Sequence, residues 1–87
     1  MSWNEVSFVV ASKTRKAILL RLDSPTTPTT LAKEMGLNLS NISRALTELE
    51  GKGMVECLTP KQRVGKIYSL TKKGIKTAHV IDNLEKK

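Results

Sequence analysis

The central segment TLAKEMGLNLSNISRALTELEGKGMV, residues 30–55, carries the strongest structural signal in this chain. It predicts a short helix that ends at Gly36, because glycine tolerates the left-handed backbone conformation that closes many helices. Leu37 is then expected to pack inward. Asn38 is the expected N-cap of a second, longer helix, which the two glycines after residue 50 interrupt. The segment therefore predicts two helices joined by a tight turn.

The longer helix has two faces of different character. Its apolar residues recur at spacings of three and four, which is typical of a stripe packed into a core. Its opposite face is small and polar, and Arg44 on it can contact guanine O6 and N7 or fork a phosphate. Such a face is expected of a helix that enters the major groove of DNA. The apolar stripe is Ile42, Ala45, Leu46 and Leu49; the polar face is Ser40, Arg44 and Thr47, flanked by Asn41 and Ser43.

Upstream of this segment, the sequence predicts an N-terminal arm and one core helix. Ser2 and Glu5 fit a capping box at the start of the arm, and Ser12 is the expected N-cap of the core helix. Thr27 caps the next helix, with Pro28 at its first position. In the core helix the expected inner residues are Ala17, Ile18, Leu19, Leu20 and Leu22, and the expected outer residues are Lys13, Arg15, Lys16 and Arg21.

Downstream, two alternating stretches predict a β-hairpin, and a one-residue strand near residues 26–27 is a further pairing partner for it. Thr71 caps a last helix, whose first turn Gly74 weakens by about 1 kcal/mol relative to alanine. Lys72 and Lys73 lie in that turn, where the helix dipole disfavours cations. They indicate either an external anion or ordinary surface lysines. The expected apolar positions of this helix are Ile75, Ala78, Ile81 and Leu84.

The predicted fold class is mainly α with a small β-hairpin. A chain of 87 residues is long enough for one modest core, so we expect a single domain over residues 1–87. Its parts are an arm (residues 1–11), a motif core (12–71) and a C-terminal helix (72–87). The helices are expected around residues 3–11, 12–22, 28–35, 39–50 and 72–84, and the strands around residues 54–58 and 66–70.

Positive charge is concentrated in one part of the chain. Lys+Arg 15 against Asp+Glu 8 gives a net charge of +7, and residues 52–76 contain seven basic side chains and one acidic one. A one-sided positive field suits a polyanion, because each neutralised phosphate releases condensed counterions. A solvated basic surface that only keeps the protein soluble is the alternative.

Four stretches in this order resemble the winged helix-turn-helix transcriptional regulators, over about residues 12–78. Residues 12–22 are similar to the first core helix of the arsenic-repressor-like group, and residues 30–37 to the first helix and turn of the motif. Residues 38–55 are similar to its recognition helix and the stop after it. Residues 68–74, YSLTKKG, are similar to the strand-to-helix step shared with the multiple-antibiotic-resistance group.

The resemblance implies a sequence-specific regulator of transcription that binds double-stranded DNA. Its recognition helix would enter the major groove, and its wing would follow the backbone or the minor groove. Two alternatives are a winged helix used for protein–protein contacts and a sequence-neutral architectural DNA-binding protein. The implied DNA-contacting residues are Asn38, Leu39, Ser40, Asn41, Ser43, Arg44 and Thr47 in the helix, and Lys61, Gln62, Arg63 and Lys66 in the wing.

A homodimer is expected, with contacts from residues 3–10 and 72–84, the two apolar elements outside the motif. Two-fold symmetry would then place two recognition helices about 34 Å apart, in successive major grooves. Trp3 is expected either to cap the core or to lie in this dimer interface.

Other functions have little support in the sequence. One cysteine, Cys57, and one histidine, His79, cannot supply a four-ligand metal site, so we expect neither metal nor cofactor. Cys57 is expected to be a buried strand residue, and a thiol redox sensor is the weaker alternative. No acid–base or nucleophile arrangement indicates an enzyme. No apolar stretch approaches the length of a membrane span and no signal peptide is visible, so a cytoplasmic location is expected.

Overall fold

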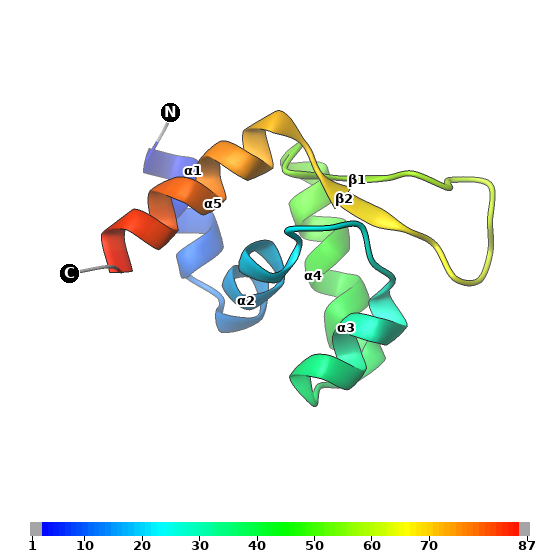
Figure 1. Ribbon diagram of the computed structural model, residues 1–87. Helices are drawn as coiled ribbons and strands as arrows, with labels where there is room; N and C mark the ends of the chain where they lie inside the picture. Colours follow the sequence, from blue (N-terminus) through cyan, green and yellow to red (C-terminus); the bar gives the residue numbers. More distant parts are fainter. Residues whose placement is uncertain (1–2, 86–87) are drawn as a thin grey trace.

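The computed structural model describes residues 3–85 and contains every element that the sequence predicts (Figure 1). The predicted class, mainly α with a small hairpin, is confirmed. Both strands are shorter than expected, while the ends of the helices agree with the predicted ones to within one residue. The elements are α1 (Trp3–Val10), α2 (Lys13–Arg21), α3 (Pro28–Met35), α4 (Leu39–Gly51), β1 (Val55–Cys57), β2 (Tyr68–Leu70) and α5 (Lys72–Glu85).

The two strands form an antiparallel ladder in which Val55 pairs with Leu70 and Cys57 with Tyr68. On its other side, Tyr68 pairs with Thr26 through two backbone hydrogen bonds of 2.8 and 3.1 Å, so the expected one-residue strand is present. Beyond Cys57 the Leu58 amide still donates to the Ile67 carbonyl at 2.7 Å. The pairing ends there, where the Ile67 amide donates to the Thr59 hydroxyl at 3.0 Å instead of to a backbone carbonyl.

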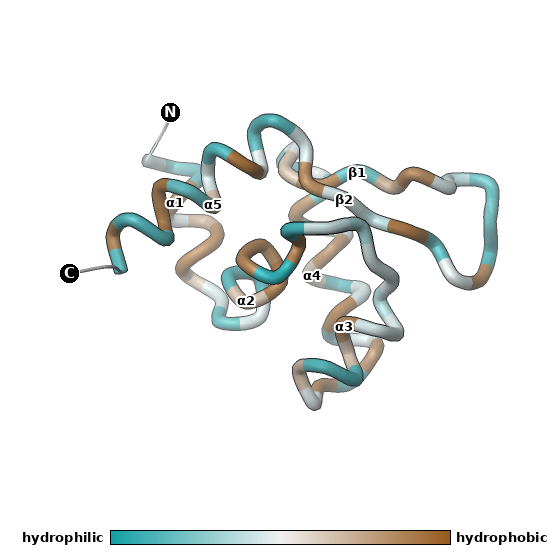
Figure 2. The backbone as a smooth tube through the Cα atoms, viewed as in Figure 1, coloured by the Kyte–Doolittle hydropathy of each residue, from teal (hydrophilic) through white to brown (hydrophobic). Residues whose placement is uncertain are grey.

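One apolar core lies between the helices and the base of the hairpin. Figure 2 shows hydrophobic stretches in the helices and also on the wing, where the side chains of Leu58 and Val64 are exposed. The stripe predicted for α4 is confirmed, since all four of its residues are buried. Because the stripe faces the core, the opposite face of α4 is left at the surface. The core consists of Val6, Val9, Ile18, Leu19, Leu22, Leu31, Ile42, Ala45, Leu46, Leu49, Met54, Val55 and Ile81.

The predicted helix ends are mostly confirmed. Ser12 Oγ accepts from the Arg15 amide at 3.2 Å, and Thr27 Oγ1 accepts from the Thr30 amide at 3.1 Å. Gly36 has φ 65° and closes α3 in the left-handed conformation. The capping box expected at the N-terminus involves Ser2, which lies outside the described residues.

Five apolar or thiol side chains are more exposed than predicted, namely Leu20, Leu37, Ile75, Leu84 and Cys57. Leu37 follows the helix end, where its amide donates to the Ala32 carbonyl at 3.1 Å, and its side chain is 38% exposed. Cys57 is half-buried, because it lies at the hairpin end of β1, beyond the fully buried Val55.

Gly74 has a packing role that the helix propensity alone does not reveal. A Cβ atom built at this position would lie 2.0 Å from the Met54 carbonyl oxygen. The same carbonyl accepts from the Thr71 amide at 3.0 Å, and the Thr71 hydroxyl accepts from the Gly74 amide at 3.1 Å. The glycine therefore lets α5 approach the start of the hairpin with backbone contact.

Candidate nucleic-acid interface

The exposed side of α4 presents the polar face that the sequence predicts. Its core stripe lies against α2 and α3, so the polar residues are directed to solvent. Arg44 makes no hydrogen bond or ion pair with any residue in the described range 3–85, and its guanidinium is available to a ligand. The predicted residues that are exposed on and before α4 are Asn38, Leu39, Ser40, Asn41, Ser43, Arg44 and Thr47.

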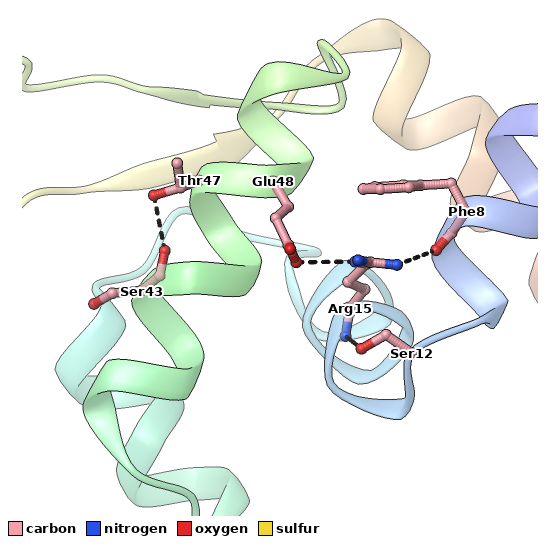
Figure 3. A network of polar contacts seen from close by, with 6 residues as sticks. All are labelled: Phe8, Ser12, Arg15, Ser43, Thr47 and Glu48. Atoms are coloured by element: carbon pink, nitrogen blue, oxygen red, sulfur yellow. Dashed lines mark hydrogen bonds and ion pairs between the residues drawn. The ribbon is translucent and has the colours of Figure 1, made fainter.

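Two of these side chains differ from the simple expectation. Asn38 begins α4 through its backbone, but its side chain makes no capping hydrogen bond. The first amides of a helix have no intrahelical acceptor, so this end of α4 keeps donors for an external acceptor. Thr47 donates its hydroxyl proton to the Ser43 carbonyl at 2.9 Å (Figure 3). Thr47 is therefore left mainly as a hydrogen-bond acceptor for a ligand.

The wing, residues 59–66, extends away from the helices between β1 and β2 (Figure 1). Its turn is shaped from within: the Gln62 amide donates to the Thr59 carbonyl at 3.1 Å, and the Gln62 side chain donates to the Val64 carbonyl at 3.4 Å. Gln62 was predicted to contact DNA, and here it also supports the tip. Of the other predicted wing residues, Lys61 and Arg63 are exposed and Lys66 is half-buried.

Arg15 was expected on the outer surface, but the structure places it in a polar contact between three helices (Figure 3). Its Nε donates to Glu48 Oε1 of α4 at 3.0 Å, and its Nη1 donates to the Phe8 carbonyl of α1 at 2.8 Å. The guanidinium also lies 4.0 Å from the centroid of the Phe8 ring. The side chain is only 19% exposed. The prediction failed because the two partners of the Arg15 side chain come from other helices, Phe8 from α1 and Glu48 from α4, and sequence spacing does not reveal that these helices meet at Arg15.

The Arg15 contact changes the acidity of Glu48. The hydrogen bond from Arg15 holds the pKa of the Glu48 carboxyl below its usual value, and the positive charges of Arg15 and Arg44 act in the same direction against some desolvation. Glu48 is therefore ionised near neutral pH, and it lies within electrostatic reach of Arg44 on the same helix.

Lys72 and Lys73 indicated either an external anion or ordinary surface lysines, and for Lys73 the structure supplies an anion from within the protein. The Lys73 ammonium pairs with the Glu5 carboxylate of α1, through an oxygen that is shielded from solvent. This pair joins α5 to α1. The sequence does not reveal it, because the two residues lie far apart in the chain. Lys72 is exposed.

The remaining chemistry-bearing residues do not gather into a site. His79 is exposed on α5, and Cys57 lies on β1. Within residues 3–85 no group of three or more His, Cys, Asp or Glu side chains is arranged to hold a metal ion. No helix in the same range has the length and apolar character needed to cross a membrane.

The sequence profile of a family described as the helix-turn-helix domain matches residues 10–57, which include α2, α3, α4 and β1. The chain belongs to the helix-turn-helix domain family. Regulators of this family are DNA-binding proteins and not enzymes, so the expectation of no catalytic activity is confirmed. No curated protein matches the chain in sequence.

Solved structures confirm the winged helix form of this helix-turn-helix protein. The reduced form of MarR from E. coli has a TM-score of 0.77 at 25% identity, over 93% of this chain and 62% of that one. The MarR family transcription regulator SP03579 has a TM-score of 0.77 at 26% identity, over 94% of this chain and 59% of that one. The resemblance to winged helix-turn-helix regulators inferred from the sequence is thus confirmed.

A more distant likeness concerns the fold alone. Lactococcus lactis ZitR, wild type in complex with DNA, has a TM-score of 0.68 at 20% identity, over 76% of this chain and 47% of that one. A ZitR variant has a TM-score of 0.73 at 23% identity, over 83% and 51%. The helix-turn-helix protein therefore spans about half the length of these ZitR chains.

Proposed function

We propose that this protein binds double-stranded DNA in a sequence-specific manner and regulates transcription. The observation that carries the proposal is the exposed face of α4. On this face Arg44 makes no hydrogen bond or ion pair with residues 3–85, and its neighbours are small hydroxyl side chains. An arginine with a free guanidinium can bond guanine bidentately, and small neighbours let the helix approach the bases. In this proposal α4 occupies the major groove.

The wing is proposed to contact the backbone or the minor groove. Lys61, Arg63 and Lys66 lie on one hairpin that projects beyond the helices, and they supply positive charge without ion-pair partners in the described part of the chain. Contacts of this type add affinity through counterion release and carry little sequence information. Together with the exposed residues of α4, these wing residues make up the proposed DNA-binding surface.

A homodimer through residues 3–10 and 72–84 is part of the proposal. Exposed apolar side chains on these helices support it: Trp3 is 66% exposed, Val10 47% and Leu84 49%. Large apolar side chains grouped at a surface often mark a protein interface. A cytoplasmic location is also proposed, in keeping with a free thiol and a chromosomal ligand.

The proposal is tested by fluorescence anisotropy. The full chain is titrated with random duplexes and with genomic fragments, each at two salt concentrations. We expect salt-sensitive binding and enrichment of a palindromic subset, as for a dimer that reads two half-sites. Salt-sensitive binding without enrichment would support the sequence-neutral architectural alternative. No binding at low salt would reject the proposal and favour a protein–protein module.

A further inference from the structure

The Glu48 carboxylate lies next to the arginine that is proposed to read DNA. Residues 44 and 48 are one helical turn apart on α4, the spacing at which oppositely charged side chains pair. Arg44 also contributes to the low pKa of Glu48, which places the two charges within electrostatic reach. Glu48 could therefore form an ion pair with the Arg44 guanidinium and repel the phosphates of DNA.

In the structure Glu48 pairs with Arg15 of α2, and it makes no hydrogen bond or ion pair with Arg44. Its carboxylate is held by Arg15 at 3.0 Å, while Ser43 and Thr47 project from the opposite side of α4 (Figure 3). Arg15 is itself fixed by the Phe8 carbonyl at 2.8 Å and by the Phe8 ring. With three anchoring contacts and an exposure of 19%, Arg15 is a preorganised partner, unlike a freely moving surface lysine.

We propose that Arg15 is a positioning residue for DNA recognition: it holds the Glu48 carboxylate away from Arg44 and so keeps the Arg44 guanidinium free for DNA. Arg15 does not touch the DNA. It acts through an ion pair that competes with the pair between Arg44 and Glu48. The inference rests on the proposed function, and it adds a role for a residue outside the recognition helix.

The first test measures DNA affinity with the duplex selected in the titration above. Arg15→Ala is expected to weaken binding up to about twofold beyond its control, the scale expected when an i, i+4 ion pair competes for the guanidinium. The control is Lys16→Ala, which removes an equal charge from α2 and breaks the ion pair of Lys16 with Glu85 of α5. Arg15→Lys replaces the alanine variant if the latter does not fold.

Two double variants separate positioning from simple stabilisation. In Arg15→Ala/Glu48→Gln no carboxylate is left to capture Arg44, so affinity is expected to return to that of Glu48→Gln alone. In an Arg44→Ala background, Arg15→Ala is expected to cost no more than Lys16→Ala. If Arg15 had only a structural role, Arg15→Ala would cause the same loss of DNA affinity in the wild type and in the Arg44→Ala background, and Glu48→Gln would not restore the affinity. That result would overturn the proposal.

The second test needs no DNA. The pKa of Glu48 is measured by NMR in the wild type, in Arg15→Ala, in Arg44→Ala and in Arg15→Ala/Arg44→Ala. Arg44 already lowers this pKa when Arg15 is present, so the test compares how much Arg44→Ala raises it in each background. If Glu48 turns to Arg44 when Arg15 is lost, Arg44→Ala should raise the pKa more in the Arg15→Ala background than in the wild type. Equal effects in the two backgrounds would overturn the inference, even if the proposed DNA binding holds. If the wild type binds no duplex, the proposed function fails and this titration still decides the inference.

Discussion

Single residues in this protein show how strongly the surrounding structure determines the role of a side chain. Gly74 is unfavourable for an isolated helix, yet the Met54 carbonyl leaves room for no other residue. Arg15, one of four basic residues on its helix, differs from the others because α1 and α4 supply acceptors on both sides of it. Packing between elements, and not composition, gives these residues their roles.

Gly74→Ala should destabilise the fold. The added methyl group would lie 2.0 Å from the Met54 oxygen, a backbone atom that cannot move without shifting β1. We expect a loss of about 1–3 kcal/mol in the free energy of unfolding, measured by urea denaturation. Gly51→Ala is the matched control, because no atom lies within 4 Å of its Cβ position and its φ is not positive. Equal stability of the two variants would show that the close contact is not needed.

Arg44→Ala should change the sequence preference of binding. If Arg44 bonds one base, its loss should cost about 1–3 kcal/mol on the best duplex and relax the preference at one position of each half-site. Competition binding against duplexes with single base changes measures this. A uniform loss over all duplexes would instead assign Arg44 to a phosphate.

The low pKa of Glu48 predicts a pH dependence of stability. The carboxylate is stabilised in the folded state by Arg15, so its contribution is present above the unfolded pKa, near 4.5, and is lost as the pH falls through the lower folded pKa. The wild type should therefore be more stable than Glu48→Gln near neutral pH, and the difference should shrink below about pH 4.5. Urea denaturation between pH 2 and about 7 measures it. A difference independent of pH would mean that the charge is not involved.

At the scale of the elements, the sequence predicted the helices and their ends well. The stripe of α4 follows from the 3.6-residue period, and Gly36 and Thr27 define the ends of α3 through their own backbone and hydroxyl chemistry. The strands were overestimated, because the alternation continues past residue 57 while the Thr59 hydroxyl ends the ladder. The Arg15–Glu48 and Lys73–Glu5 pairs were not predictable, since each joins helices far apart in the chain.

The wing as an element should determine the salt dependence of binding. If Lys61, Arg63 and Lys66 each neutralise one phosphate, their joint replacement by Gln should reduce the log–log slope of affinity against salt by about 3 per protomer. Anisotropy titrations over several salt concentrations give the slope. Lys76→Gln on α5 is the control and should leave the slope unchanged. An unaltered slope in the triple variant would remove the wing from the DNA interface.

At the scale of the whole molecule, the proposed DNA-binding and dimer surfaces lie at different ends. The Cα trace extends over 38 × 24 × 19 Å, with the wing at one end and α1 and α5 at the other (Figure 1). The central helix α4 is joined to α1 by Arg15, and α5 is joined to α1 by Lys73. A dimer formed through α1 and α5 would therefore present both wings outward.

Trp3→Glu with Leu84→Glu should shift the protein toward the monomer. Both side chains are exposed and apolar, and a carboxylate in a dimer interface would be desolvated without a partner. Light scattering coupled to size-exclusion chromatography measures the mass. Leu37→Glu, an exposed leucine at the turn between α3 and α4, should leave the mass unchanged. A monomeric wild type would remove the dimer from the proposal.

The junction between the hairpin and α5 has an evolutionary consequence. Thr71 donates its hydroxyl to the Gly53 carbonyl at 2.5 Å and accepts from the Gly74 amide, and Gly74 fits against Met54. These contacts join parts of the protein to one another and are independent of any base sequence. If the outer face of α4 reads the operator as proposed, substitutions on it would redirect such a protein to a new operator, while Thr71 and Gly74 would stay under selection for folding alone. A shared junction motif identifies common ancestry of the scaffold, but it carries no information about the genes under control.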